Sequence, residues 1–238
     1  MTTITAQLPT TTPAAAPPPV TLRKWVRRRV RRLQYIWAER QLRRHGLLAP
    51  FAGRPADAFK PDYADLWYLY KLVRSRRPEC VLEFGAGCST VVLAAALRDN
   101  HAAAGAGAAA GRIVSVDGQA RWAELAAANL PADLRPYARV SHVPALECEA
   151  AGTPGFRYDP AGLGDVVPDL IYLDGPELTH HRKVTANPLD LEPVLKPGCL
   201  IVVDGRLDAQ AFLKKNLKRR WRHKVNGLLV NAEFHLLE

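Results

Sequence analysis

The sequence predicts an α/β fold built on a doubly wound, mostly parallel sheet of seven strands. Short apolar runs alternate with longer segments of helical periodicity along residues 55–238, which is typical of parallel strands joined by crossover helices. The first strand runs into a glycine turn, VLEFGAGCST at 81–90. A glycine turn at the carboxyl end of a first strand is where an open α/β sheet binds its ligand, because glycine lets the backbone approach closely.

The expected elements follow one another in a regular order. A helix over 61–77 begins at Pro61 and precedes the first strand. The strands are expected at 81–84, 112–116, 139–143, 169–173, 199–203, near 220–225 and near 231–237. The helices between them are expected at 89–98, 119–129, 188–195 and 206–217. Two segments rich in small residues and proline predict irregular loops, at 99–111 and 147–167.

Four segments of the chain resemble the class I S-adenosylmethionine-dependent methyltransferases, a Rossmann-like superfamily. They are VLEFGAGCST at 81–90, IVSVDGQARW at 113–122, PDLIYLDGPE at 168–177 and PGCLIVVDGR at 197–206. Together they follow the order and spacing of that family. The resemblance implies a methyltransferase that uses S-adenosylmethionine as its cofactor. It also implies a C-terminal hairpin that places one antiparallel strand in the sheet.

The carboxylate before the glycine turn narrows the choice of cofactor. A dinucleotide would place a pyrophosphate over this turn, where Glu83 would repel it, whereas the ammonium and sulfonium of S-adenosylmethionine would be attracted. Thr90 replaces the third glycine of the dinucleotide pattern, so a nicotinamide-dependent oxidoreductase is disfavoured. Gly85 and Gly87 are expected to shape the turn against the methionine part of the cofactor. Ser89 is a further candidate contact, although it is better suited to capping the next helix.

Three other residues are candidates for binding the cofactor. Asp117 ends the second strand, and its two oxygens can accept hydrogen bonds from ribose hydroxyls. The alternative is that Asp117 caps the helix over 119–129, and the two roles are compatible. Gly118 and Ala145 are expected along the edge of the adenine. The third strand ends without an acidic residue, so adenine contacts there are expected to come from backbone and apolar groups.

The loop after the fourth strand supplies the catalytic candidates. Asp174 ends this strand and is expected to contact both cofactor and acceptor, with His181 as a second candidate base and His180 beside it. The sequence after the strand is Asp-Gly-Pro-Glu, whereas family members that methylate amino groups of nucleic-acid bases carry an Asn/Asp-Pro-Pro-aromatic sequence. This difference favours O-methylation of a small-molecule or glycan-type acceptor.

No metal is expected in the reaction. Asp174 and Asp204 end neighbouring strands, but Gly205 stands where a third oxygen ligand would follow. Two carboxylates fall short of the six or so oxygens that Mg²⁺ requires, unless waters or His181 complete the shell. The four cysteines show no paired spacing and are expected to be reduced, as in a bacterial cytoplasmic protein.

The positive charge is concentrated near the N-terminus. Residues 1–20 carry no charged side chain and are expected to be a disordered Thr/Ala/Pro tail. Residues 21–45 hold ten Lys or Arg and one acid, a net +9 of the total +10. We expect a basic amphipathic helix and a connector over residues 21–54. A methyltransferase domain follows at 55–238, and we expect it to fold without the preceding residues.

The basic helix admits several interpretations. Its apolar stripe can pack on the domain, or bind an anionic membrane surface such as the inner face of the cell membrane. Its arginines can instead hold an RNA backbone, and a mitochondrial presequence is a further alternative. The corresponding alternatives for function are an RNA methyltransferase and a non-catalytic methyltransferase-like binding protein. The oligomeric state stays open.

Overall fold

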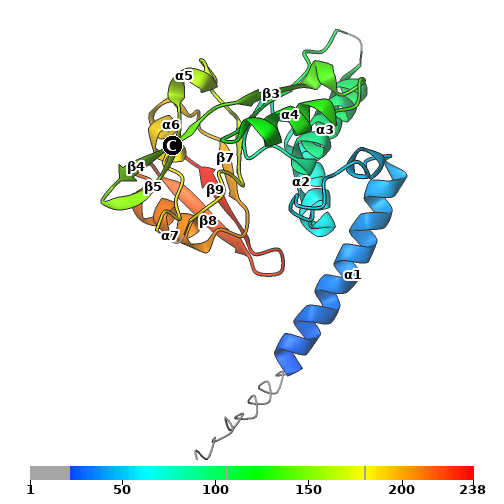
Figure 1. Cartoon of the computed structure of the whole chain (residues 1–238), viewed down its shortest axis with the longest axis horizontal. Helices are drawn as coiled ribbons and strands as arrows, with labels where there is room; N and C mark the ends of the chain where they lie inside the picture. The colour runs from blue at the N-terminus through cyan, green and yellow to red at the C-terminus, as the bar shows by residue number, and fades with distance from the viewer. Residues whose placement is uncertain (1–21, 106, 180) are drawn as a thin grey trace, which may run out of the picture.

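The computed structural model describes residues 22–105, 107–179 and 181–238, and Figure 1 shows these elements. The expected tail at 1–20 and His180 lie outside the described residues. Seven strands form one sheet in the order β3-β2-β1-β6-β7-β9-β8. They are β1 (Cys80–Phe84), β2 (Arg112–Asp117), β3 (Ala138–His142), β6 (Leu170–Leu173), β7 (Leu200–Val203), β8 (Trp221–Asn226) and β9 (Asn231–Leu236). Strand β9 is antiparallel to both neighbours, whereas the pairs from β3 to β7 are parallel, which confirms the predicted sheet.

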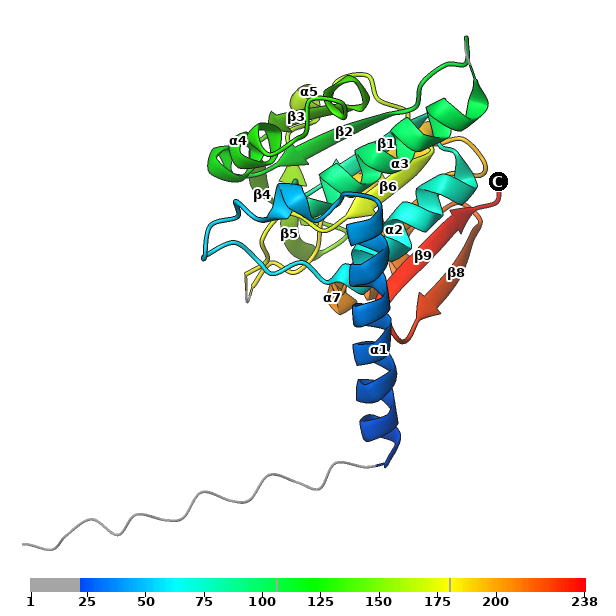
Figure 2. The ribbon, with the colours of Figure 1, turned by 90° about the vertical axis from the view of Figure 1, so that its right-hand side faces the viewer.

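Helices cover both faces of the sheet (Figure 2). They are α1 (Leu22–Arg44), α2 (Tyr63–Arg76), α3 (Cys88–Ala104), α4 (Ala120–Ala128), α5 (Pro160–Leu163), α6 (Asn187–Leu191) and α7 (Leu207–Asn216). Three short 3-10 helices lie at Ala49–Phe51, Arg135–Tyr137 and Glu192–Val194. Because successive strand side chains point to opposite faces, Val81 enters the core with α2 and α3, and Leu82 enters the core with α7.

Two expected loops contain regular structure. Helix α3 continues through the alanine-rich run to Ala104, because alanine is the best helix former, and it ends at Gly105 with a φ of +88°. Residues 147–167 were expected to be irregular, but strands β4 (Ala145–Ala150) and β5 (Thr153–Tyr158) form a separate hairpin there. Both strands of an isolated hairpin are edge strands, which explains why Pro154 is accommodated.

Helix α1 is only partly attached to the domain. Ala38 and Leu42, near its C-terminal end, are buried in the core that contains α2 and α3. The core thus includes residues of α1, and the expectation that residues 55–238 fold without this helix stays a prediction. The N-terminal end of α1 extends away from the sheet, and 51% of Trp25 and 66% of Leu33 are exposed (Figures 1 and 2). No helix of the described part of the chain is long and apolar enough to cross a membrane.

The division of α1 can be tested by removing one leucine from each part. We expect Leu42→Ala to lower the free energy of unfolding by about 2–5 kcal/mol, because it leaves a cavity in the core. The matched variant Leu33→Ala should change it by less than about 0.5 kcal/mol, because Leu33 lies in solvent. Urea unfolding of the full-length chain measures both values. Equal losses would show that α1 is attached along its whole length.

Candidate cofactor site

The carboxyl ends of the central strands meet at one edge of the sheet. Strands β1, β2, β6 and β7 are parallel, so the residues that end them or follow them gather there: Glu83, Asp117, Asp174 and Asp204. The register of the sheet sets Glu83 opposite Ser115 on β2 and Tyr172 on β6. In an open α/β sheet this edge is where ligands bind.

The glycine turn and the loop after β6 approach so closely that both need glycine. Gly85 has a φ of +99°, and a Cβ atom there would lie 2.8 Å from the Gly175 nitrogen. A Cβ atom on Gly175 would lie 2.6 Å from the Gly85 nitrogen and 2.4 Å from the Tyr158 hydroxyl. Gly87 is different, since no heavy atom lies within 4 Å of the place where its Cβ would be. The open side of the turn is therefore at Gly87, and a ligand can reach the backbone there.

Glu83 holds the turn from below. Its side chain is fully buried, and one oxygen accepts hydrogen bonds from the hydroxyls of Thr90 and Ser115, both at 2.6 Å. Thr90 in turn accepts a hydrogen bond of 3.0 Å from the Gly87 N–H. Burial raises the pKa of Glu83 to about 7, while the nearby hydroxyls of Ser115, Ser89 and Thr90 oppose this rise.

The position of Glu83 changes the role expected for it. We expected its carboxylate to point into the turn, but the carboxylate lies beneath the turn and positions the backbone of Gly87 through Thr90. Ser89 is likewise buried beside Glu83 in the first turn of α3. The second oxygen of Glu83 has no hydrogen-bond partner among the described residues.

Three residues expected to bind the cofactor lie together beyond β2. The two oxygens of Asp117 accept hydrogen bonds from the Gln119 N–H at 2.9 Å and the Ala86 N–H at 3.1 Å. Each oxygen keeps a further lone pair, so the carboxylate can still accept hydroxyl hydrogen bonds. Burial raises the pKa of Asp117, and the two backbone hydrogen bonds oppose this effect. A Cβ atom on Gly118 would lie 3.0 Å from the Ala145 Cβ, so these two residues are neighbours.

The loop after β6 is held by an arginine that follows β7. Arg206 donates hydrogen bonds to the carbonyls of Asp174 and Pro176, the latter at 2.7 Å. The Asp174 side chain is 44% exposed, and its Oδ1 lies 3.5 Å from the Arg206 guanidinium, which opposes the rise of its pKa. This partial burial raises its pKa to about 7, and the carboxylate of Asp204 adds to the effect. Asp204 accepts a hydrogen bond of 3.3 Å from the Tyr172 hydroxyl, and burial raises its pKa as well.

The other expected catalytic residue, His181, makes no hydrogen bond to Asp174. His181 lies exposed in the loop after β6, with no hydrogen bond or ion pair to any described residue. Among the described residues, no three His, Cys, Asp or Glu side chains are arranged to hold a metal ion. The absence of a metal from the reaction stays a prediction.

Sequence reasoning missed several residues of this edge. The buried hydroxyl of Tyr158 comes from the unexpected hairpin and has no hydrogen-bond partner among the described residues. Arg206 directly follows Asp204-Gly205, so its position in the sequence offered a signal. Asp65, at the start of α2, has a pKa raised to about 8 by burial and by the carboxylates of Asp204 and Asp62.

The burial of Glu83 predicts a pH dependence of stability. Glu83 keeps its proton up to about pH 7 in the folded chain but releases it near its ordinary pKa when unfolded, so stability should fall as pH rises between these values. Glu83→Gln should remove this component, which is about 3 kcal/mol. Urea unfolding from pH 4.5 to 8 measures the slope, with the exposed Glu79→Gln as the control. Identical slopes in the native chain and Glu83→Gln would contradict the prediction.

The family of the chain follows from comparison with known proteins. The model of the methyltransferase domain family matches residues 82–205, more than half of the chain. No curated protein shows significant sequence similarity to the chain.

Solved structures share its fold. A putative O-methyltransferase from Klebsiella pneumoniae is 16% identical, with a TM-score of 0.54 over 88% of this chain and 100% of that one. An SAH-bound methyltransferase from Podospora anserina is 12% identical, with a TM-score of 0.56 over 94% and 100% of the two chains. A putative caffeoyl-CoA O-methyltransferase from Staphylococcus aureus is 14% identical, with a TM-score of 0.56 over 87% and 99%. The chain belongs to the methyltransferase domain family, and its fold is the one implied by the resemblance of its four sequence segments to the class I S-adenosylmethionine-dependent methyltransferases.

Proposed function

We propose that the protein transfers the methyl group of S-adenosylmethionine to a hydroxyl oxygen of a small-molecule or glycan-type acceptor. The observation that carries this proposal is the carboxylate of Asp174, which is partly exposed at the ligand-binding edge and has a pKa raised to about 7. A hydroxyl acceptor must lose its proton as it is methylated. A general base works best when its pKa lies near the working pH.

The residues around the turn fit the parts of the cofactor. The open backbone at Gly87 would receive the methionine part, and the free lone pairs of Asp117 would accept hydrogen bonds from the ribose hydroxyls. Gly118 and Ala145, which lie side by side, would line the adenine. When bound, S-adenosylmethionine supplies an electrophilic methyl group on a positively charged sulfur.

The protein's own contribution is to align the acceptor and take its proton. Arg206 fixes the backbone of Asp174 and Pro176, so the base is held in place by hydrogen bonds to its own loop. Asp174 would accept the proton of the acceptor hydroxyl as that oxygen is methylated, and bound S-adenosylmethionine would supply the methyl group and leave as S-adenosylhomocysteine. Correct placement of the reactants supplies much of the rate enhancement in such a transfer.

Two binding measurements test the cofactor site. Calorimetry should detect binding of S-adenosylmethionine and S-adenosylhomocysteine and no tight binding of NAD. Asp117→Ala should weaken the affinity by about 1–3 kcal/mol, the range for a hydrogen bond to a charged group. Asp208→Ala, an exposed carboxylate on α7, is the matched control and should bind normally. An unchanged affinity in Asp117→Ala would remove this residue from the ribose role.

A pH profile tests the proposed base. Labelled cofactor and fractionated extracts would first identify an acceptor, in buffer with EDTA because no metal is expected. The rate should then rise as pH passes through about 7, where Asp174 becomes ionised. Asp174→Asn should lower kcat by about 100-fold or more and abolish this rise, whereas Asp208→Asn should change neither. A rise that persists in Asp174→Asn would assign the base elsewhere, and loss of all activity in EDTA would point to a metal.

A further inference from the structure

Helix α1 turns Arg27 and Arg31 toward the domain, and it turns an apolar stripe bordered by other arginines toward solvent. Arg31 donates hydrogen bonds to the Leu228 carbonyl and to the Asp62 carboxylate, the latter at 2.6 Å. Arg27 donates to the Gly227 carbonyl. These contacts, with the buried Ala38 close by, hold one side of the helix against the domain. The opposite side is therefore left without a described partner.

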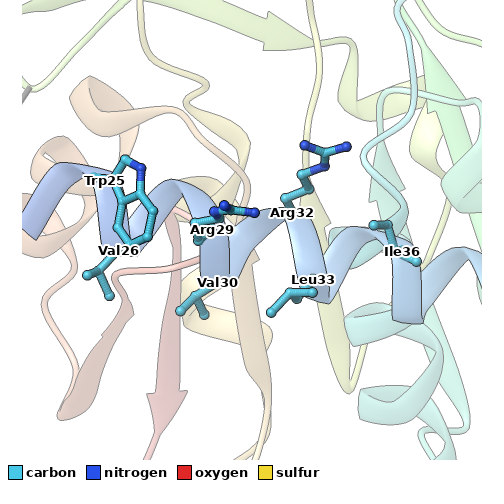
Figure 3. A pocket seen from close by; sticks show the side chains of 7 residues that line it. All are labelled: Trp25, Val26, Arg29, Val30, Arg32, Leu33 and Ile36. Carbon is cyan, nitrogen blue, oxygen red and sulfur yellow. The ribbon is translucent and has the colours of Figure 1, made fainter.

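The outward side forms a shallow apolar groove. Figure 3 shows the side chains that line it: Trp25, Val26, Arg29, Val30, Arg32, Leu33 and Ile36. The apolar members are all at least one-third exposed. A soluble helix ordinarily buries its apolar stripe, so a contiguous exposed one marks an interaction site.

Positive charge borders the apolar groove. Arg29 and Arg32 line it, and the guanidinium of Arg29 lies 5.2 Å from the centre of the Trp25 ring. The exposed Arg28 lies next to them on the same helix. Residues 21–45 carry a net charge of +9, whereas the remainder of the chain is almost neutral. A partner of this surface must therefore accept apolar side chains and bear negative charge.

We propose that the outward side of α1 binds an anionic lipid surface. Tryptophan and branched apolar side chains would enter the boundary between headgroups and acyl chains, while the bordering arginines would contact lipid phosphates. A second copy of the chain is disfavoured, because it would bring another charge of +9 against the first. An RNA backbone would pair with arginines but would leave the apolar groove uncovered.

Vesicle flotation of the full-length chain tests this proposal. Vesicles of phosphatidylcholine with phosphatidylglycerol should bind the protein, vesicles of phosphatidylcholine alone should not, and added salt should weaken binding. Trp25→Gln with Leu33→Gln should lower the partition coefficient at least about tenfold, since burial of one large apolar side chain has this scale. Val194→Gln with Val225→Gln, which alters two similarly exposed residues elsewhere, is the matched control and should bind normally. Urea unfolding confirms that each variant is folded.

Three results would overturn the proposal. One is the absence of binding to anionic vesicles. Another is a vesicle binding that is lost in Arg28→Gln with Arg32→Gln but kept in the Trp25 and Leu33 variant. Such binding would be purely electrostatic, and an RNA oligomer would then bind in the same way. The third is a chain that does not bind vesicles but dimerises in ultracentrifugation as its concentration rises, with the dimer lost in the Trp25 and Leu33 variant. That result would assign the groove to a second copy.

Discussion

The candidate site depends on one close approach between two backbones. The turn at Gly85 and the loop at Gly175 meet with no room for a Cβ atom on either residue. Three side chains surround this contact: Glu83 supports the turn through Thr90, Arg206 binds the loop carbonyls, and the Tyr158 hydroxyl lies against Gly175. The contact closes the turn at Gly85, whereas the turn is open at Gly87. The place where a ligand can reach the backbone is thus set by packing behind the turn.

The same edge of the sheet concentrates carboxylates that are difficult to ionise together. Burial raises the pKa of Asp65, Asp174 and Asp204. The negative charge of another acid nearby raises the pKa of each of these carboxylates further. Two arginines compensate for this negative charge, Arg206 from within the domain and Arg31 from helix α1. A basic helix is therefore attached to an acidic edge, although the net charges of the two segments would not reveal which residues make the contact. Electrostatics thus connects the N-terminal helix to the candidate site.

The seven strands of the main sheet and the residues at their ends could be predicted because each depends on local pattern. Apolar runs, glycine positions and the acids Asp117 and Asp174 are visible in the sequence, and parallel topology brings strand ends together. The direction of the Glu83 side chain could not be predicted, because it depends on Thr90 and Ser115, which approach it from α3 and β2. The hairpin that supplies Tyr158 was hidden by glycine and proline. Those residues break a central strand but are tolerated in an isolated edge pair.

Helix α1 shows why amphipathic periodicity alone does not reveal which side of a helix faces the protein. The apolar stripe from Trp25 to Leu33 predicts burial against the domain, yet carbonyl oxygens and the carboxylate of Asp62 bind Arg27 and Arg31 on the opposite side of the helix. The small side chain of Ala38 lets the helix lie close to the core on that side. Leaving water costs less free energy for an arginine that finds fixed backbone acceptors than for one that faces an apolar core. The apolar groove is thus left exposed by the contacts that attach the helix, and a partner can cover it without displacing the domain.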